Sequence, residues 1–124
     1  MVLFKRTKRE DTKLLKVVNE LQLVLGKEKV LSEIEDRLCY SYDGTKQNAL
    51  PDIVIRPGTT FDVSATLKVA NKYEIPVYAR GAGTGLSGGA VPLHGGIVFD
   101  LKGMNKIISV CPEDFVATVE PGVV

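Results

Sequence analysis

Near the amino end of the chain, apolar residues recur every three or four positions, as they do along one face of a helix. Between residues 12 and 25 these apolar positions are Leu14, Val18, Leu21 and Leu25. We therefore predict an amphipathic helix over residues 12–25, which Gly26 ends. Ser32 and Glu35 have the spacing of a capping box and predict a short helical turn further on.

The middle of the chain alternates short apolar runs with one helical pattern. Three runs predict strands at residues 52–56, 75–80 and 96–101, the last almost wholly apolar, as in a central buried strand. Residues 61–74 predict a helix, with Thr60 or Asp62 near its start as a cap. Its expected buried face holds Val63, Leu67 and Ala70. A strand, a helix and a strand with short connections predict a parallel strand pair with a right-handed crossover.

After residue 101 the pattern becomes that of a hairpin. Residues 106–110 and 115–120 read as short strands joined by four residues, Cys111 to Asp114, which predicts antiparallel pairing. The fold class we expect is α+β: a small parallel β-α-β subdomain with flanking helices, followed by the start of an antiparallel sheet. We divide the chain into a helical segment at residues 1–46 and a second unit at residues 47–124. The polar residues 41–48, with Asp43 forming a turn, predict a loop between them.

Charge and cysteine content narrow the class of protein. Sixteen basic and fifteen acidic residues give a net charge of +1, which argues against bulk attraction to nucleic acid or acidic lipid. The basic run at the amino end is interrupted by acidic residues, and we interpret it as a solvated approach to the first helix; its residues are Lys5, Arg6, Lys8, Arg9 and Lys13. We expect Cys39 and Cys111 to be buried small hydrophobes in a reducing compartment, not a disulfide or a zinc site. With no secretory signal or transmembrane run in the sequence, we expect a cytoplasmic location.

Residues 80–90 read RGAGTGLSGGA and hold the main candidate for chemistry. Glycine loses more backbone freedom on folding than any other residue, so five glycines in eleven positions indicate that the main chain must approach a ligand closely. Consecutive amides can form a nest that binds an anion, while Thr84 and Ser87 add hydroxyl groups and Arg80 adds charge. A diphosphate is the expected ligand. The alternative interpretation is a mobile surface loop without a ligand.

Two familiar phosphate-binding motifs are rejected on context. Gly83, Gly85 and Gly88 spell the G-x-G-x-x-G of the doubly wound dinucleotide fold, but that motif needs a helix to begin at its third glycine. Here Pro92 and a further glycine pair follow, and a helix is not expected to survive them. A Walker-type loop is rejected because no Gly-Lys-Ser/Thr follows the glycines.

Four segments carry a more specific resemblance: PDIVIRPGTT, VYARGAGTGLSGGA, GGIVFDL and VEPGV. In this order and spacing they resemble the FAD-binding segment of the vanillyl-alcohol oxidase and para-cresol methylhydroxylase family. The branch they resemble most is that of the FAD-linked chain of glycolate oxidase and of D-lactate dehydrogenase. The resemblance covers about residues 30–124. It implies the amino-terminal part of an FAD-binding domain, incomplete at its carboxyl end, whose exposed strand edges would favour self-association.

The resemblance also implies which residues bind the cofactor. The family's pyrophosphate loop falls on Arg80, Gly81, Ala82, Gly83, Thr84, Gly85, Leu86, Ser87, Gly88 and Gly89. Within it, the expected phosphate donors are the amides of Gly81, Gly83, Thr84, Gly85 and Gly88. Pro57 matches a residue along the adenine and ribose of FAD, and Pro121 and Gly122 match a stretch near the cofactor. The loop lacks the histidine that bonds covalently to flavin in some members, so we expect non-covalent FAD.

The implied activity is the flavin-dependent oxidation of a 2-hydroxy acid to a 2-oxo acid, with oxygen, a quinone or a partner protein taking the electrons. Glycolate, D-lactate and D-2-hydroxyglutarate remain open as substrates. The family's catalytic residues match no position here, so we assign none, and we interpret His94 as an ordinary loop residue. The alternative from another class is a shortened chain that acts as a non-catalytic nucleotide- or anion-binding module.

Overall fold

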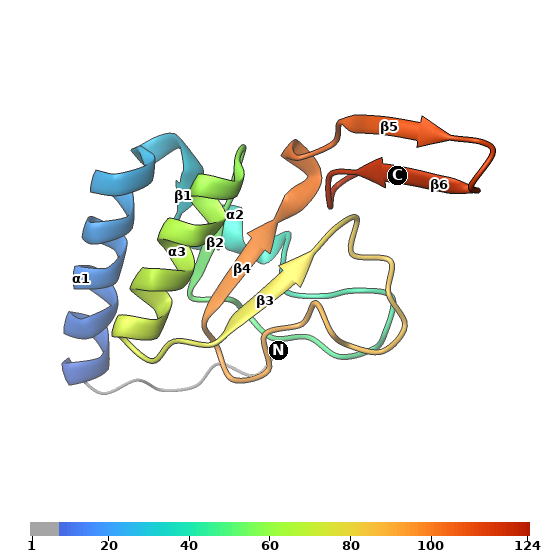
Figure 1. The fold of residues 1–124 in the computed structure, drawn as a ribbon. Helices are drawn as coiled ribbons and strands as arrows, with labels where there is room; N and C mark the ends of the chain where they lie inside the picture. Colours follow the sequence, from blue (N-terminus) through green and yellow to red (C-terminus); the bar gives the residue numbers. More distant parts are fainter. Residues whose placement is uncertain (1–7) are drawn as a thin grey trace.

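The computed structural model describes residues 8–124 (Figure 1). In chain order the elements are α1 (Lys8–Leu25), the 3₁₀ helix η1 (Lys27–Lys29), β1 (Val30–Leu31), α2 (Ile34–Leu38), β2 (Ile53–Ile55), α3 (Thr60–Lys72), β3 (Val77–Arg80), β4 (Ile97–Asp100), the 3₁₀ helix η2 (Leu101–Gly103), β5 (Ile107–Cys111) and β6 (Val116–Val119). Parallel and antiparallel sheets in one chain confirm the α+β prediction. The part of the basic run that precedes Lys8 lies outside the described residues.

Four strands form the main sheet in the order β1-β2-β4-β3. Strands β2 and β3 both run parallel to β4, and β1 pairs antiparallel to β2. The two strands that flank α3 are therefore parallel, as predicted, but the expectation that they pair directly is wrong because β4 lies between them. Every residue of β4 is buried. A central strand is hydrogen-bonded to a neighbour on each side and covered on both faces, which explains this burial.

The sheet is packed on both faces, and this packing fixes its position. On one face, the buried side chains of α1 and α3 meet alternate residues of β2 and β4; this cluster includes Val17, Leu21, Val69, Ile53, Ile55, Ile97 and Phe99. On the other face, Tyr40 packs against Val54 and Val98. Figure 1 shows α1 and α3 side by side against the sheet. Helix α1 thus shares one core with the strands, while the predicted boundary after residue 46 remains a prediction.

Both long helices were predicted, with corrections in their details. Helix α1 begins at Lys8, four residues earlier than expected. In α3 the prediction that Leu67 lies on the buried face is wrong, because Leu67 is 41% exposed and Thr66 is buried instead. Thr66 tolerates burial because its hydroxyl donates to the carbonyl of Asp62 at 2.8 Å.

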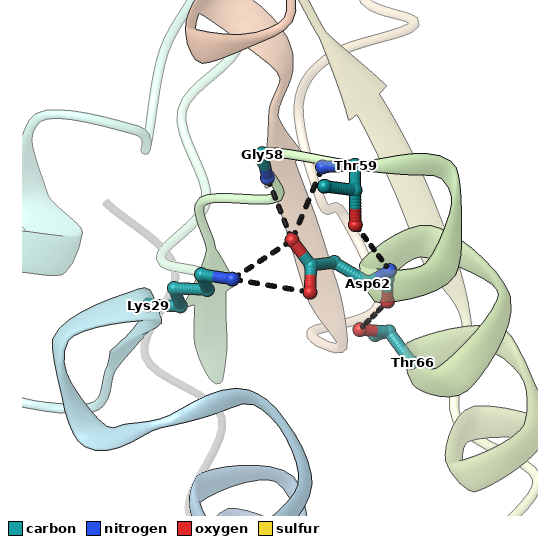
Figure 2. Close-up of polar contacts among 5 residues, drawn as sticks. All are labelled: Lys29, Gly58, Thr59, Asp62 and Thr66. Carbon is teal, nitrogen blue, oxygen red and sulfur yellow. Dashed lines mark hydrogen bonds and ion pairs between the residues drawn. The ribbon is translucent and has the colours of Figure 1, made fainter.

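The start of α3 is fixed by a polar cluster, drawn in Figure 2. The N-cap is Thr59, not Thr60 or Asp62, and its hydroxyl accepts from the Asp62 amide at 3.2 Å. The Asp62 carboxylate accepts from the amides of Gly58 and Thr59 at 2.8 and 3.1 Å and pairs with Lys29 at 3.0 Å. Burial alone would raise the pKa of Asp62, but the Gly58 amide and the Lys29 ammonium outweigh it and hold the pKa below its usual value. The cluster therefore ties the turn after β2 to both α3 and η1.

Two further local predictions are wrong, one about a capping box and one about the cysteines. The capping box at Ser32 and Glu35 does not form: Glu33 is the N-cap of α2, and no side chain caps that helix. Cys39 is exposed at the end of α2, and Cys111 is half-buried in the hairpin, so neither is a buried core residue. A five-residue helix turns few of its side chains toward the core, which explains the exposure of Cys39.

The predicted hairpin is confirmed as the antiparallel pair β5 and β6. In Figure 1 it stands apart from the four-stranded sheet. Its apolar side chains are exposed, among them Ile107, Ile108, Val110, Phe115 and Val116. The self-association expected of such strands stays a prediction. Within residues 8–124, no helix has the length and apolar character needed to cross a membrane.

Candidate functional site

The cofactor-binding residues predicted from sequence gather at one edge of the main sheet. Because β2, β4 and β3 are parallel, their carboxyl ends meet at the same edge, where open sheets of this kind bind ligands. Pro57 follows β2, and the glycine segment begins directly after β3. The amide of Gly122 donates to the carbonyl of Met104 at 2.7 Å, which brings Pro121 and Gly122 back beside the chain that leaves β4.

The glycine loop, residues 81–89, has no regular secondary structure. In the described chain, the next helical element after Arg80 is η2 at Leu101–Gly103. The rejection of the doubly wound dinucleotide motif is therefore confirmed, since no helix begins at Gly88. His94 lies in the turn that follows and is exposed, as expected of an ordinary loop residue.

The glycines of this loop fall into two groups, and a different physical reason requires glycine in each. Gly83 and Gly88 have φ angles of 74° and 76°, in the left-handed region that side-chain-bearing residues avoid. Gly81 and Gly85 lie outside that region, and a Cβ added to either would meet no atom within 4 Å. Neither backbone strain nor packing against the protein explains these two glycines. Open space against bare main chain is what a ligand lying on the loop needs, so the loop fits a diphosphate.

The hydrogen bonds of the loop also fit the binding of a diphosphate. The carbonyl oxygens of Gly85 and Gly88 accept from the amides of Gly44 and Val91, at 3.0 and 3.1 Å. By contrast, within the described part of the chain no amide of residues 82–90 donates to a main-chain oxygen. Apart from the amide of Gly88, which lies near the carboxylate of Asp43, these amides are left for another acceptor, and consecutive main-chain amides are good donors to an anion.

Arg80, the last residue of β3, places its charge beneath the loop. It is only 7% exposed, and a Cβ on Gly83 would overlap its guanidinium group. The guanidinium donates to the carbonyl of Tyr42 and lies 5.8 and 6.0 Å from the ring centres of Tyr40 and Tyr42. The sequence identified Arg80 as a source of charge but gave no hint of either tyrosine, because nothing in their spacing links them to the loop.

Asp43 has the turn-forming role that the sequence predicted. One carboxylate oxygen, Oδ1, accepts from the amide and the hydroxyl of Thr45 at 2.8 and 2.6 Å. These bonds are the main reason why the pKa of Asp43 is lowered, and the charge of Arg80 adds to the effect. The other oxygen, Oδ2, is buried without a hydrogen-bond partner.

A second acidic residue, Asp100, stabilises the same edge and was not singled out in the sequence. It lies at the carboxyl end of β4, in register with Arg80. Its carboxylate accepts from the hydroxyl of Tyr40 at 2.8 Å, and the Arg56 Nε atom lies 3.7 Å away. Burial and this hydrogen bond raise the pKa of Tyr40. Tyr40 thus links the end of β4, which its hydroxyl contacts, to Arg80, which lies over its ring. The only sign of Asp100 in the sequence was that an acidic residue ends an apolar run.

A glycine loop at the carboxyl edge of a parallel sheet, with amides that pair with no main-chain oxygen, is typical of proteins that bind a cofactor through its diphosphate. A family model described as "FAD binding domain" matches residues 51–124. The chain belongs to this family, and the prediction of FAD as its cofactor is confirmed.

Curated relatives and solved structures agree with this assignment. The chain is 40% identical over 109 residues to glycolate oxidase subunit GlcD of Bacillus subtilis, covering 87% of this chain and 23% of that protein. It is 44% identical over 73 residues to the probable mitochondrial D-lactate dehydrogenase of Danio rerio, covering 59% of this chain and 15% of the relative. It therefore spans about a quarter or less of the length of these relatives.

Among solved structures, p-cresol methylhydroxylase with bound substrate superposes with a TM-score of 0.80 at 31% identity, covering 90% of this chain and 23% of that one. The 4-ethylphenol oxidase of Gulosibacter chungangensis gives a TM-score of 0.77 at 30% identity, with the same coverage. The predicted resemblance to the para-cresol methylhydroxylase type is confirmed.

Proposed function

We propose that this chain is the FAD-binding part of an oxidoreductase that converts a 2-hydroxy acid to a 2-oxo acid. The observation that carries the FAD site is the open space at Gly81 and Gly85, which neither the fold nor the backbone conformation requires. The choice of substrate class is supported by similarity to proteins whose names include glycolate oxidase and D-lactate dehydrogenase.

In this proposal the glycine loop holds the diphosphate. The donors are the amides of Gly81, Gly83, Thr84 and Gly85, together with the hydroxyls of Thr84 and Ser87. The amide of Gly88, also a predicted donor, we assign to the carboxylate of Asp43. Ala82, Leu86 and Gly89 complete the loop around them. Pro57 is fully buried, so in this proposal it shapes the turn that would lie beside the adenine and ribose. Pro121 and Gly122 would lie near the cofactor, where Gly122 packs against the carbonyl of Leu101. Residues 80–90 contain no histidine that could bond to the flavin ring, and in this proposal the loop holds FAD non-covalently.

The residues of this chain bind and orient the cofactor. When bound, FAD supplies a two-electron acceptor: the substrate loses a hydride from its α-carbon and a proton from its hydroxyl, which leaves a 2-oxo acid. We assign the proton-accepting base to no residue of this chain. One of the similar proteins is named as a subunit, and by analogy a partner protein could take the electrons from the reduced cofactor.

Titration with FAD, followed by quenching of flavin fluorescence, tests the binding site. We expect saturable binding by the wild-type chain and at least about tenfold weaker binding by Gly85→Ala, whose methyl group would occupy the ligand's place. Ser64→Ala, at an exposed position of α3, is the control and should bind as the wild type does. Absence of saturable binding, or equal affinity of Gly85→Ala, would refute the site.

Substrate oxidation is tested on the FAD-loaded protein purified from its native source. Glycolate, D-lactate and D-2-hydroxyglutarate are added without oxygen, and loss of the flavin's visible absorbance is followed. We expect at least one of them to reduce the flavin. If FAD binds but none reduces it, a non-catalytic nucleotide-binding module is the better description.

A further inference from the structure

A segment before the family-matched region supports the glycine loop from outside. Residues 42–47, here called the bracing segment, precede residue 51, where the match to the family model begins. The carbonyl of Tyr42 accepts from Arg80, and the amide of Gly44 donates to Gly85 at 3.0 Å. In Figure 1 this segment and the glycine loop run beside each other below the β5–β6 hairpin. The loop, which has few contacts of its own, is therefore positioned from the bracing segment.

Gly44 makes a close main-chain contact between the two segments. A Cβ added there would lie 2.9 Å from the carbonyl oxygen of Gly85 and 3.0 Å from that of Thr84. Gly44 does not have a left-handed φ angle, so its own backbone would accept alanine. The close approach of the glycine loop is thus the reason for glycine at this position.

Gln47 makes a second close approach to the loop, at Gly88. Its side-chain oxygen would lie 2.5 Å from a Cβ added to Gly88. Gly88 therefore needs to be glycine both for its positive φ angle and for this contact. Together, Gly44 and Gln47 hold the loop at Gly85 and Gly88.

Asp43, next to Gly44 in the bracing segment, has one carboxylate oxygen without a hydrogen-bond partner. The residue is 8% exposed, and its Oδ2 atom is buried without a hydrogen-bond partner. A buried carboxylate oxygen without a donor is costly, and such an atom needs an explanation. The neighbouring donor group is the main-chain amide of Gly88, which lies near enough to contribute, after Thr45 and Arg80, to the low pKa of Asp43.

We propose that Asp43 and Gly44 are positioning residues for diphosphate binding, with Oδ2 of Asp43 as the acceptor for the Gly88 amide when the loop holds its ligand. The inference rests on the proposed function of the loop. A carboxylate close to a diphosphate would repel it, but Arg80 lies beside Asp43 and balances its charge. Attraction for the ligand then comes from the loop amides that the brace holds in place.

The test compares Asp43→Asn with the wild type in the FAD titration. Asparagine keeps an oxygen for the Thr45 bonds but replaces Oδ2 with an NH₂ group, which would face the Gly88 amide as a second donor. A role in the turn alone predicts wild-type affinity for this variant. A positioning role predicts binding about tenfold weaker at an unchanged melting temperature. Asp11→Asn, the same change at an exposed position of α1, is the matched control and should bind as the wild type does.

Gly44→Ala supplies the second arm of the test. Its methyl group would displace residues 84–86, and we expect a similar loss of about tenfold or more in FAD affinity. If Gly44→Ala melts at a lower temperature, Asp43→Asn, which has the size of the native residue, decides the question. Wild-type affinity in Asp43→Asn, or in folded Gly44→Ala, overturns the inference.

The Gly85→Ala variant separates this inference from the proposed function. If Gly85→Ala weakens FAD binding while Asp43→Asn and Gly44→Ala do not, the cofactor site stands and only the positioning role fails. If the wild type does not bind FAD, the proposed function itself fails.

Discussion

The glycine loop lies at the edge of the sheet where strand β4 ends, but the strand and the loop are held in place by opposite means. All four residues of β4 are buried, and large side chains pack on both of its faces. The loop has few side chains, and at Gly81 and Gly85 the space beside the main chain is open. In the strand, side chains determine the structure, whereas in the loop their absence leaves room for a ligand. The main four-stranded sheet, here called the floor, thus gives rigid support to a loop whose exposed main chain can bind FAD.

The contacts that hold the loop come from its surroundings. Arg80 anchors its start beneath Gly83, and Gly44 fixes its middle through Gly85. The Asp62 cluster in turn fixes the neighbouring turn at Pro57 and Gly58. Substitutions in the floor should therefore reduce stability, and substitutions in the loop should reduce affinity for FAD.

The largest effect on stability is expected from Ile97→Ala in the centre of the floor. Ile97 is fully buried between strands β2 and β3, so its truncation leaves a cavity. We expect a loss of about 2–5 kcal/mol in the free energy of unfolding, measured by urea denaturation. The folded fraction should still bind FAD with nearly wild-type affinity. A large loss of affinity at full folding would break the division between floor and loop.

Asp62→Ala should have the next largest effect. It removes the acceptor for two amides at the start of α3 and leaves Lys29 without its carboxylate partner. We expect a loss of about 1–2 kcal/mol in the free energy of unfolding. Ser64→Ala on the same helix is the control and should unfold at the wild-type urea midpoint.

The same cluster predicts a dependence on pH. Because the pKa of Asp62 is lowered in the folded chain, its stabilising effect is complete above the unfolded pKa of about 3.9. It is lost as the pH falls toward the folded pKa, since the protonated acid no longer pairs with Lys29. Urea midpoints of the wild type and Asp62→Asn should therefore converge as the pH is lowered through this range. A constant difference between them would contradict the assignment.

Gly81→Ala should change stability by less than about 0.5 kcal/mol, because its methyl group would enter open space. Its affinity for FAD should nevertheless fall by about tenfold.

Gly122→Ala is the opposite case: its methyl group would overlap the carbonyl of Leu101, so the free energy of unfolding should fall. Thermal melting and FAD titration on both variants separate the two kinds of glycine.

The smallest effect is expected at the outer surface of the helices. Glu20 pairs with Lys72 at 2.9 Å, and hydrogen bonds from Lys72 and Tyr73 lower the pKa of Glu20. The pair is exposed and screened by salt, so Glu20→Gln should leave both the melting temperature and the FAD affinity within experimental error. A clear drop in melting temperature would show that the α1–α3 contact depends on this pair.

Local sequence patterns predicted the elements well where a residue's neighbours along the chain decide its environment. The stripe of Leu21 and Leu25 predicted α1, and the apolar run at residues 96–101 predicted a central strand. Local rules failed where a distant contact decides. Leu67 has the right spacing for the core, yet the buried face of α3 is rotated toward Thr66, and Cys39 follows a helix too short to turn it inward.

The sequence by itself determined the strands, the helices and the loop with its bare main chain, because glycine content and hydrophobic period are properties of adjacent residues. Only the tertiary structure decided that β4 lies between β2 and β3, that Arg80 is buried under Gly83, and that Asp43 and Gly44 lie against Gly85 and Gly88. The contacts of Asp43 and Gly44 with the loop, and the pairing of β2 with β4, join residues about forty positions apart. They depend on how the two faces of the sheet are covered, which no local pattern in the sequence encodes.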